Sequence, residues 1–263
     1  LRTAIRGESS EAGPFTLAIS AAAPMAALMA PVLGAAALPL ALVPVGLTAV
    51  AVRRYAAVGE TFRQTVRALS RLTEEGGYTP AHHSERVADL ARAMGERLGV
   101  AERELLDLEY SALLHDLGQV SLREPLEGGA TIHVAPADQQ RIADHGAEIV
   151  RRNPGLVAAA DFIATQAVPY RAVVEDLAEV PLSGRVLKVA NAFDDLTGGR
   201  RTPAVVAQAL ERIELGLGYE YDPVTVAALA TIVGDEVRGQ SPRATAGQDT
   251  ARLSDHSRSR LMP

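Results

Sequence analysis

The sequence predicts an all-α protein, a helical bundle preceded by an apolar helical hairpin. Aromatic residues make up only 4% of the 263 residues and Trp is absent, so the core must consist mainly of Leu, Val, Ile and Ala, which suits helices better than a β-sandwich. Apolar residues recur at spacings of three and four, and no segment alternates convincingly with a period of two. An uncharged N-terminal run supplies the predicted hairpin.

Composition and charge exclude several function classes. The chain has no cysteine, so disulfide frameworks, cysteine zinc sites and thiol nucleophiles are excluded. The net charge is −6, which argues against a partner that is a nucleic-acid polymer, because such proteins need a basic surface. The first residue is Leu1, so we expect that the chain is a piece of a longer protein.

The hairpin prediction comes from residues 15–52, 38 consecutive uncharged positions. One helix of this length would measure about 57 Å, whereas the hydrocarbon core of a bilayer is about 30 Å thick. Two transmembrane helices over 15–33 and 35–52 fit better, with a turn near Pro31 to Gly34. The prolines in the run should kink or break these helices.

Basic residues flank the uncharged run on both sides. Arg2 and Arg6 lie in the N-terminal segment 1–14, and Arg53 and Arg54 follow the run. The positive-inside rule then places both ends in the cytoplasm. We therefore expect membrane lipid as a partner and a cytoplasmic domain anchored to the cell membrane. A buried Ala-rich core hairpin and a signal peptide are the alternatives, although a signal peptide has a shorter apolar region.

A connector helix is predicted within residues 53–78. Phe62, Val66, Leu69 and Leu72 form one apolar stripe over 58–73, through which two copies of the chain could form a homodimer. Gly76 and Gly77 should end it. The helical bundle follows at 79–238, and the polar, Arg- and Ser-rich tail 239–263 is expected to be disordered.

Further helices are predicted from apolar spacing and capping signals. Thr79–Pro80 is a typical helix start, a hydroxyl cap followed by Pro, and Ser183, Thr202 and Asp222 are further candidate caps. The predicted helices run from about residue 80 to 98, and over 101–116, 136–152, 156–166, 184–197, 203–215 and 223–237.

Five of the six histidines fall within residues 82–145. His83 borders an apolar stripe, His115 and Asp116 follow the apolar run Ala112 to Leu114, and His145 lies between apolar neighbours at helical spacing. Imidazoles and a carboxylate that face one core from separate helices are typical of a metal site of mixed nitrogen and oxygen ligands, which suits Mn, Fe, Zn or Mg. A metal-bound water would be the nucleophile for a phosphoester.

Four blocks of sequence resemble the HD superfamily of metal-dependent phosphohydrolases, and more narrowly its HD-GYP branch, which hydrolyses cyclic di-GMP in bacteria. They are HSERV at 83–87, LLHDLG at 113–118, RVLKVANAFDDLT at 185–197 and YEYDP at 219–223. The resemblance implies an HD-type helical bundle of six to eight helices. It also implies that His83, His115 and Asp116 are metal ligands and that His145 is the additional ligand of the HD-GYP branch.

The sequence departs from the family pattern in three places. The branch's His-His-Glu triplet and Gly-Tyr-Pro motif are replaced by ATQAVPY at 164–170. The closing aspartate ligand of the HD fold is Asn191, whose amide oxygen can coordinate a metal but brings no charge. The lysine that often follows the His-Asp pair is Gln119. We therefore expect at most one weakly held divalent metal, bound by His83, His115, Asp116 and either Asn191 or His145.

Two functions follow as hypotheses. The first is a metal-dependent phosphohydrolase acting on a nucleotide or cyclic-dinucleotide phosphoester, with Asp116 also orienting the attacking water as a catalytic residue. The second is a catalytically weak module that binds a nucleotide or relays a membrane signal. Asp194 and Asp195 could also coordinate a metal, but acids at a helix end are usually solvated. Solvated positions are also expected for four more residues: His82, His133, Arg151 and Arg152.

Overall fold

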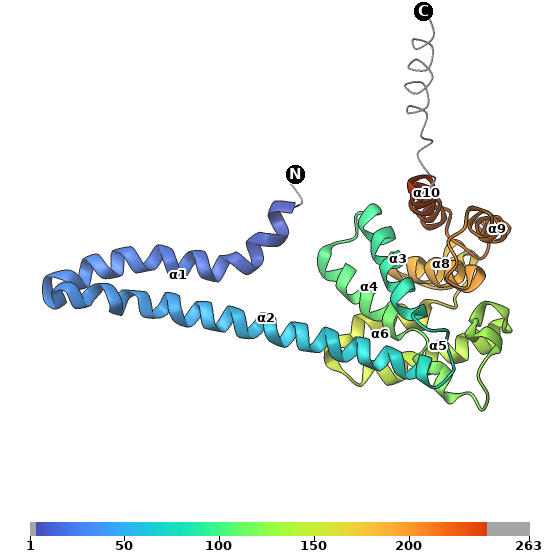
Figure 1. Ribbon diagram of the computed structural model, residues 1–263, viewed down its shortest axis with the longest axis horizontal. Helices are drawn as coiled ribbons and strands as arrows, with labels where there is room; N and C mark the ends of the chain where they lie inside the picture. The colour runs from blue at the N-terminus through green and yellow to red at the C-terminus, as the bar shows by residue number, and fades with distance from the viewer. Residues whose placement is uncertain (1–3, 241–263) are drawn as a thin grey trace, which may run out of the picture.

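A computed structural model describes the backbone of residues 4–240 and most of their side chains, those of 4–15, 18 and 240 excepted. A long helical hairpin projects from a compact helical bundle (Figure 1). The described residues contain no β-strand, only an isolated bridge between Leu217 and Tyr221. The all-α prediction is therefore confirmed. Most of the tail predicted to be disordered lies outside the described residues.

The hairpin consists of helices α1 (Ala4–Leu33) and α2 (Ala37–Glu75), joined by a short 3-10 turn (Gly34–Ala36). Gly34 has a φ of +52°, so the chain reverses where the sequence predicts the turn. Helix α2 continues through Pro44 without a break. It also continues past residue 53, so the predicted connector is not a separate helix but the second half of α2.

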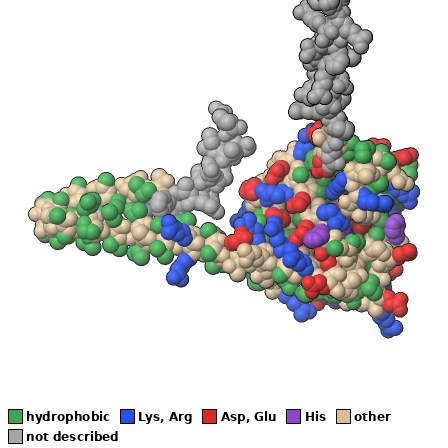
Figure 2. Space-filling model, viewed as in Figure 1, with side chains coloured by type: hydrophobic (Ala, Val, Ile, Leu, Met, Phe, Trp, Pro, Cys, Tyr) green, Lys and Arg blue, Asp and Glu red, His purple; other side chains and the backbone are tan. Residues whose placement is uncertain are grey.

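Apolar side chains cover the outer part of the hairpin, whereas charged side chains gather over the bundle (Figure 2). Leu28 and Val32 are more than 80% exposed. Among the described residues, one stretch within Ile19–Glu75 is long and apolar enough to cross a membrane, with a mean hydropathy of 2.1. Only 11% of its most apolar window is buried within the molecule, so the protein itself does not cover this surface.

The C-terminal half of α2 joins the hairpin to the bundle. Val66 is fully buried in the bundle core, and the ring of Phe62 packs edge-on against Tyr110 at 5.5 Å. Leu69 and Leu72 remain largely exposed. The predicted apolar stripe is thus divided between the core and the surface.

The bundle encloses one core that contains Met94, Leu108, Ile163, Leu187 and Phe193, all fully buried. One helix, α7, is only five residues long and was not predicted, because a single turn has no measurable periodicity. The helices of the bundle are α3 (His83–Arg97), α4 (Glu102–Leu114), α5 (Pro136–Arg151), α6 (Val157–Thr165), α7 (Tyr170–Val174), α8 (Leu182–Thr197), α9 (Pro203–Glu214) and α10 (Pro223–Gln240).

The predicted start of α3 at Thr79–Pro80 is wrong. The helix begins at His83, after His82 with a φ of +60°. The hydroxyl of Thr79 donates to Thr73 Oγ1 in α2 instead of capping a helix. The displaced start puts the His83 side chain in the first turn of α3, where it faces the core.

The other predicted caps have mixed outcomes. Asp222 caps α10, because its Oδ1 accepts a hydrogen bond from Val224 N at 2.9 Å. Thr202 occupies the cap position of α9, but its side chain makes no capping bond. Ser183 lies inside α8 and donates to Glu104 at 2.7 Å, so this predicted cap is wrong.

Candidate metal centre

Two imidazoles and one carboxylate converge inside the bundle. His83 Nε2 lies 3.3 Å from His115 Nε2, and each of these nitrogens lies 3.2 Å from Asp116 Oδ2. All three side chains are at least 97% buried. In the described part of the chain, this is the only group of three or more His, Asp or Glu side chains with the spacing of metal ligands.

Backbone geometry at the end of α4 fixes the position of Asp116. His115 and Asp116 follow the helix directly and lead into a 3-10 turn (Leu117–Ser121) that packs against α5. A Cβ atom at Gly118 would lie 1.9 Å from the carbonyl oxygen of Ile142. Only glycine therefore allows this turn to approach α5 so closely.

The outer ring nitrogens of the two histidines have their own partners. His83 Nδ1 lies 2.8 Å from Asp194 Oδ2, and His115 Nδ1 lies 2.7 Å from the carbonyl oxygen of Ala112. A carbonyl oxygen can only accept, so in a neutral His115 the proton is on Nδ1, and an ionised Asp194 imposes the same tautomer on His83. Both Nε2 lone pairs then face each other and Asp116, an arrangement that requires a proton or a cation between them.

The site fits a divalent metal ion. Two ligands that are each about 2.0–2.2 Å from one ion lie roughly 3–3.5 Å apart, which matches the observed separations of 3.2 and 3.3 Å. Asp116 Oδ2 is buried, and the two Nε2 atoms at 3.2 Å are its only polar partners among the described residues. Nitrogen and oxygen ligands in this mixture suit Mn, Fe or Zn.

Electrostatics show what holds the group together without a metal. Burial alone would lower the pKa of His83, but its contacts with Asp116 and Asp194 outweigh burial and raise the pKa to about 10. Burial likewise opposes ionisation of Asp116, yet the neighbouring His115 and His83 hold its pKa below the ordinary value. The pKa of His115 is raised as well, so these shifts favour a protonated imidazole beside an ionised Asp116.

Asp194 is buried, so the prediction that it is solvated is wrong. Its side chain is only 1% exposed. Besides His83, it binds Arg86 in bidentate fashion, with Nε at 2.9 Å from Oδ1 and the terminal nitrogen at 2.8 Å from Oδ2. A carboxylate behind a ligating histidine fixes both the tautomer and the orientation of the ring.

The structure separates the two candidate closing ligands. Asn191 is 92% buried and donates from Nδ2 to Thr131 Oγ1 at 3.2 Å, which leaves its Oδ1 buried and without a partner. It lines the same pocket as Asp116. His145 is half-buried on α5 and lies neither in the three-residue group nor in the wall of this pocket. The structure therefore does not bring His145 to the other predicted ligands.

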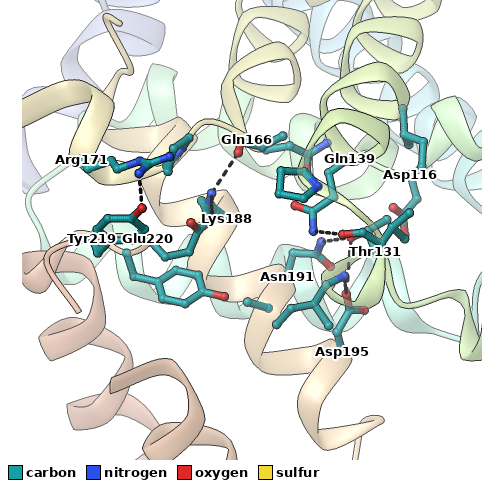
Figure 3. Close-up of a pocket in the computed structure, with 18 residues that line it drawn as sticks. Asp116, Thr131, Gln139, Gln166, Arg171, Lys188, Asn191, Asp195, Tyr219 and Glu220 are labelled. Carbon is teal, nitrogen blue, oxygen red and sulfur yellow. Dashed lines mark hydrogen bonds and ion pairs between the residues drawn. The ribbon is translucent and has the colours of Figure 1, made fainter. Parts of the chain in front are cut away.

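Asp116 is the member of this group that lines a pocket of about 510 Å³ (Figure 3). Asp116, Asn191 and Asp195 line it at one end, and Arg171 and Lys188 at the other. Residues 164–170, which replace the family's His-His-Glu and Gly-Tyr-Pro elements, contribute part of the wall between these ends.

The cationic end of the pocket is partly occupied by its own contacts. Lys188 Nζ donates to the carbonyl oxygens of Ala167 and Val168 and pairs with Glu220 at 2.5 Å. Burial lowers the pKa of Lys188 despite this ion pair. The Arg171 guanidinium lies over the ring of Tyr219 at 4.4 Å. Arg171 is exposed, so it is the cation better placed to meet a ligand.

Asp195 lines the pocket, although it was expected to be solvated at a helix end. Its Oδ2 accepts only two long hydrogen bonds, from Ile132 N at 3.4 Å and Thr131 Oγ1 at 3.5 Å. Burial, with a smaller contribution from the negative charge of Asp116, raises the pKa of Asp195 to about 7. Its four-residue spacing from Asn191 is the sequence signal that could have placed both on one helix face.

The residues predicted to be solvated otherwise lie at the surface. His82 is exposed and pairs with Glu85, and His133 is exposed in the loop before α5. Arg151 and Arg152 are also exposed. Arg151 pairs with Asp161 at 2.8 Å, and Arg152 pairs with Glu148 at 3.5 Å.

A comparison with protein families agrees with this geometry. Residues 81–196 match the model of the HD domain family. This segment of the chain is similar to the HD domain family. The match begins just before His83 and ends just after Asp195, so the three converging side chains and the two α8 residues Asn191 and Asp195 all lie within the matched segment.

Two curated proteins are similar to this chain in sequence. A cyclic di-GMP phosphodiesterase of Thermotoga maritima is 26% identical over 178 residues, which cover 63% of this chain and 48% of the relative. A 3'3'-cGAMP-specific phosphodiesterase 2 of Vibrio cholerae is 25% identical over 198 residues, which cover 70% of this chain and 37% of the relative. The chain thus spans less than half the length of either relative.

A solved structure, the HD domain of the L. monocytogenes phosphodiesterase PgpH, also matches. It is 15% identical, with a TM-score of 0.41, over 66% of this chain and 97% of that chain.

Proposed function

We propose that this protein is a divalent-metal-dependent phosphohydrolase that cleaves a phosphoester of a nucleotide or cyclic dinucleotide. One observation carries the proposal: two imidazole Nε2 atoms and a carboxylate oxygen lie within 3.3 Å of one another, and the carboxylate belongs to Asp116, which lines the pocket. The HD domain match and the two phosphodiesterase relatives support it.

His83, His115 and Asp116 would hold the ion, with Asn191 Oδ1 as a further neutral ligand. A bound divalent ion supplies an acidified water and polarises a phosphoryl oxygen. Asp194 keeps His83 in its ligating tautomer, and Asp116 can accept a hydrogen bond from the attacking water. Arg171 on the opposite wall is placed to neutralise a second phosphate or a distal charge of the substrate.

The substrate that we expect for this chain differs from the substrates given in the names of its relatives. Those names specify cyclic di-GMP and 3'3'-cGAMP. Here the segment 164–170 lacks the histidines and the Gly-Tyr-Pro motif, and Gln166 Nε2 instead donates to the carbonyl oxygen of His115 at 3.1 Å. We therefore expect slow or undetectable turnover of cyclic di-GMP and faster turnover of simpler phosphoesters.

The test is a hydrolysis assay on metal-free protein reloaded separately with Mn²⁺, Fe²⁺, Zn²⁺ or Mg²⁺. Substrates are bis(p-nitrophenyl) phosphate, cyclic di-GMP and 3'3'-cGAMP. Activity with at least one metal, lost in His115→Ala and kept in His82→Ala, supports the proposal. Absence of activity with every metal contradicts it for these substrates. Rapid cyclic di-GMP hydrolysis that His83→Ala abolishes would contradict the expected substrate preference.

A second function, relay of a membrane signal, is favoured by the continuity of α2. We propose that α1 and α2 cross the membrane as a hairpin with both ends in the cytoplasm, where the HD domain then lies. Helix α2 runs from the apolar region into the bundle, where its Val66 is buried in the core. The exposed Leu69 and Leu72 would be free to meet a second copy of the chain. Chemical crosslinking of the full-length protein, with and without Leu72→Glu, tests this dimer.

A further inference from the structure

We propose that Asp195 supplies the metal-centre carboxylate that is missing at position 191. This inference rests on the proposed metal-dependent function and concerns the same site. It gives a role to a side chain that the resemblance does not include among the metal ligands.

The first argument is position. Asn191 and Asp195 are four residues apart on α8, so their side chains project from the same face of the helix. Both line the pocket end that also contains Asp116 (Figure 3). Thr131 links them, because its Oγ1 accepts a hydrogen bond from Asn191 and donates to Asp195. The next turn of the same helix thus presents a carboxylate to the pocket.

The second argument is charge. A divalent ion next to His83, His115 and Asp116 would meet only one negative charge from these ligands, and uncompensated charge in a buried site is costly. Asp194 cannot balance it, because Arg86 already neutralises that carboxylate. No arginine or lysine among the described residues forms an ion pair with Asp195. Asp195 is therefore the nearby negative charge that remains available.

The third argument is unsatisfied oxygen atoms. Asn191 Oδ1 is buried without a partner. The two hydrogen bonds of Asp195, at 3.4 and 3.5 Å, are longer than the usual roughly 2.9–3.0 Å. The Asp195 carboxylate lies outside the three-atom group, held by long hydrogen bonds that are weak enough to be exchanged for a cation. A bound cation would satisfy both oxygens.

The experiment measures Mn²⁺ binding to the full-length protein in detergent, by the electron paramagnetic resonance signal of free Mn²⁺ and by calorimetry. Asp195→Asn keeps the shape and removes the charge. Asn191→Asp/Asp195→Asn moves the carboxylate back by one turn. Asp161→Asn removes an exposed carboxylate from the surface pair with Arg151 and serves as the matched control. Asp195→Ser is a second variant if Asp195→Asn folds poorly.

We expect Asp195→Asn to weaken Mn²⁺ binding by more than about tenfold, the double variant to recover wild-type affinity, and Asp161→Asn to bind like the wild type. Unchanged binding in Asp195→Asn, or a double variant as weak as Asp195→Asn, would overturn the inference and leave the proposed function standing. Absence of Mn²⁺ binding in the wild type itself would overturn the inference for Mn²⁺ and count against the proposed function as well.

Discussion

His83 uses its two ring nitrogens for different tasks. Nδ1 is held by Asp194, which is itself held by Arg86. This chain of contacts leaves Nε2 as a lone-pair donor that faces His115 and Asp116. Whether a proton or a metal ion occupies the space between these atoms then determines the chemistry of the whole pocket.

Replacing a single ligand should remove the metal. His115→Ala deletes one of three converging ligand atoms, and we expect it to lose more than the roughly 10–100-fold in affinity that is typical when an outer contact is lost. Metal analysis of purified protein measures this directly. His82→Ala is the matched control, because His82 is exposed and pairs only with Glu85. Equal metal content in the wild type and His115→Ala would show that the ion binds elsewhere.

Metal-free protein should lose thermal stability as the pH rises. Burial lowers the pKa of His83, but Asp116 and Asp194 raise it overall from 6.5 to about 10. A pKa raised by folding contributes stability that is complete below the unfolded pKa and lost as the pH rises through the folded pKa. The decline should therefore lie between about pH 6.5 and 10, as measured by thermal unfolding in the presence of EDTA.

Protonation of His83 should also make metal affinity depend on pH, in the direction opposite to that of thermal stability. A metal ion must displace the proton from His83, so the apparent affinity should rise over this pH range. Calorimetry in buffers with different ionisation enthalpies counts the protons released. Uptake without proton release would contradict a protonated His83.

Only part of the candidate site could be predicted from the sequence. His83, His115 and Asp116 stand in apolar surroundings and in recognisable motifs, and the structure brings them together. His145 has the same helical spacing to apolar neighbours, but the direction in which α5 presents it depends on packing between helices. Asp194 resembled an ordinary solvated acid because its burial depends on Arg86, 108 residues away in the sequence.

At the scale of elements, the approach of the 3-10 turn to α5 positions the site. Gly118 lies against the backbone of Ile142, and this turn follows Asp116 directly. Long helices with a strong apolar periodicity were predicted well, because their apolar residues are buried in one common core. Their ends were predicted less well, because Thr79–Pro80 has the residue types of a cap while Thr79 is used in a contact with α2.

A methyl group at this turn should be severely destabilising. Gly118→Ala would place Cβ 1.9 Å from a carbonyl oxygen, so the backbone must shift, and we expect at least the roughly 1–3 kcal/mol that is typical of overpacking. Metal affinity should fall as well, since Asp116 moves with the turn. Chemical denaturation and metal titration measure the two effects.

Gly59→Ala is the control for Gly118→Ala. A Cβ at Gly59, which lies inside α2, meets no atom within 4 Å. Alanine is favoured over glycine in helices by about 0.5–1 kcal/mol, so this variant should be as stable as the wild type or more stable. Equal stability of Gly118→Ala and the wild type would contradict the tight approach of the turn to α5.

At the scale of the whole molecule, one helix, α2, joins an exposed apolar hairpin to a helical bundle with a charged surface. An apolar surface of this extent on a soluble protein is unusual. Full-length protein should therefore sediment with membranes and resist carbonate extraction, whereas residues 53–263, which retain Phe62 and Val66 for the core, should stay in the supernatant. Full-length protein that is recovered wholly in the soluble fraction would contradict the anchor.

Because α2 is unbroken, it fixes the distance between the membrane surface and the helical bundle. With the hairpin in a bilayer as proposed, Arg53 lies at the membrane surface, and Val66 is the first residue after it in α2 that is fully buried in the bundle core. Thirteen residues of helix separate them, about 20 Å. Electrostatic screening at physiological salt acts over about 8 Å. A chain with a net charge of −6 can thus be tethered beside anionic lipids while its pocket samples ligands from bulk water, beyond the repulsive field of the surface.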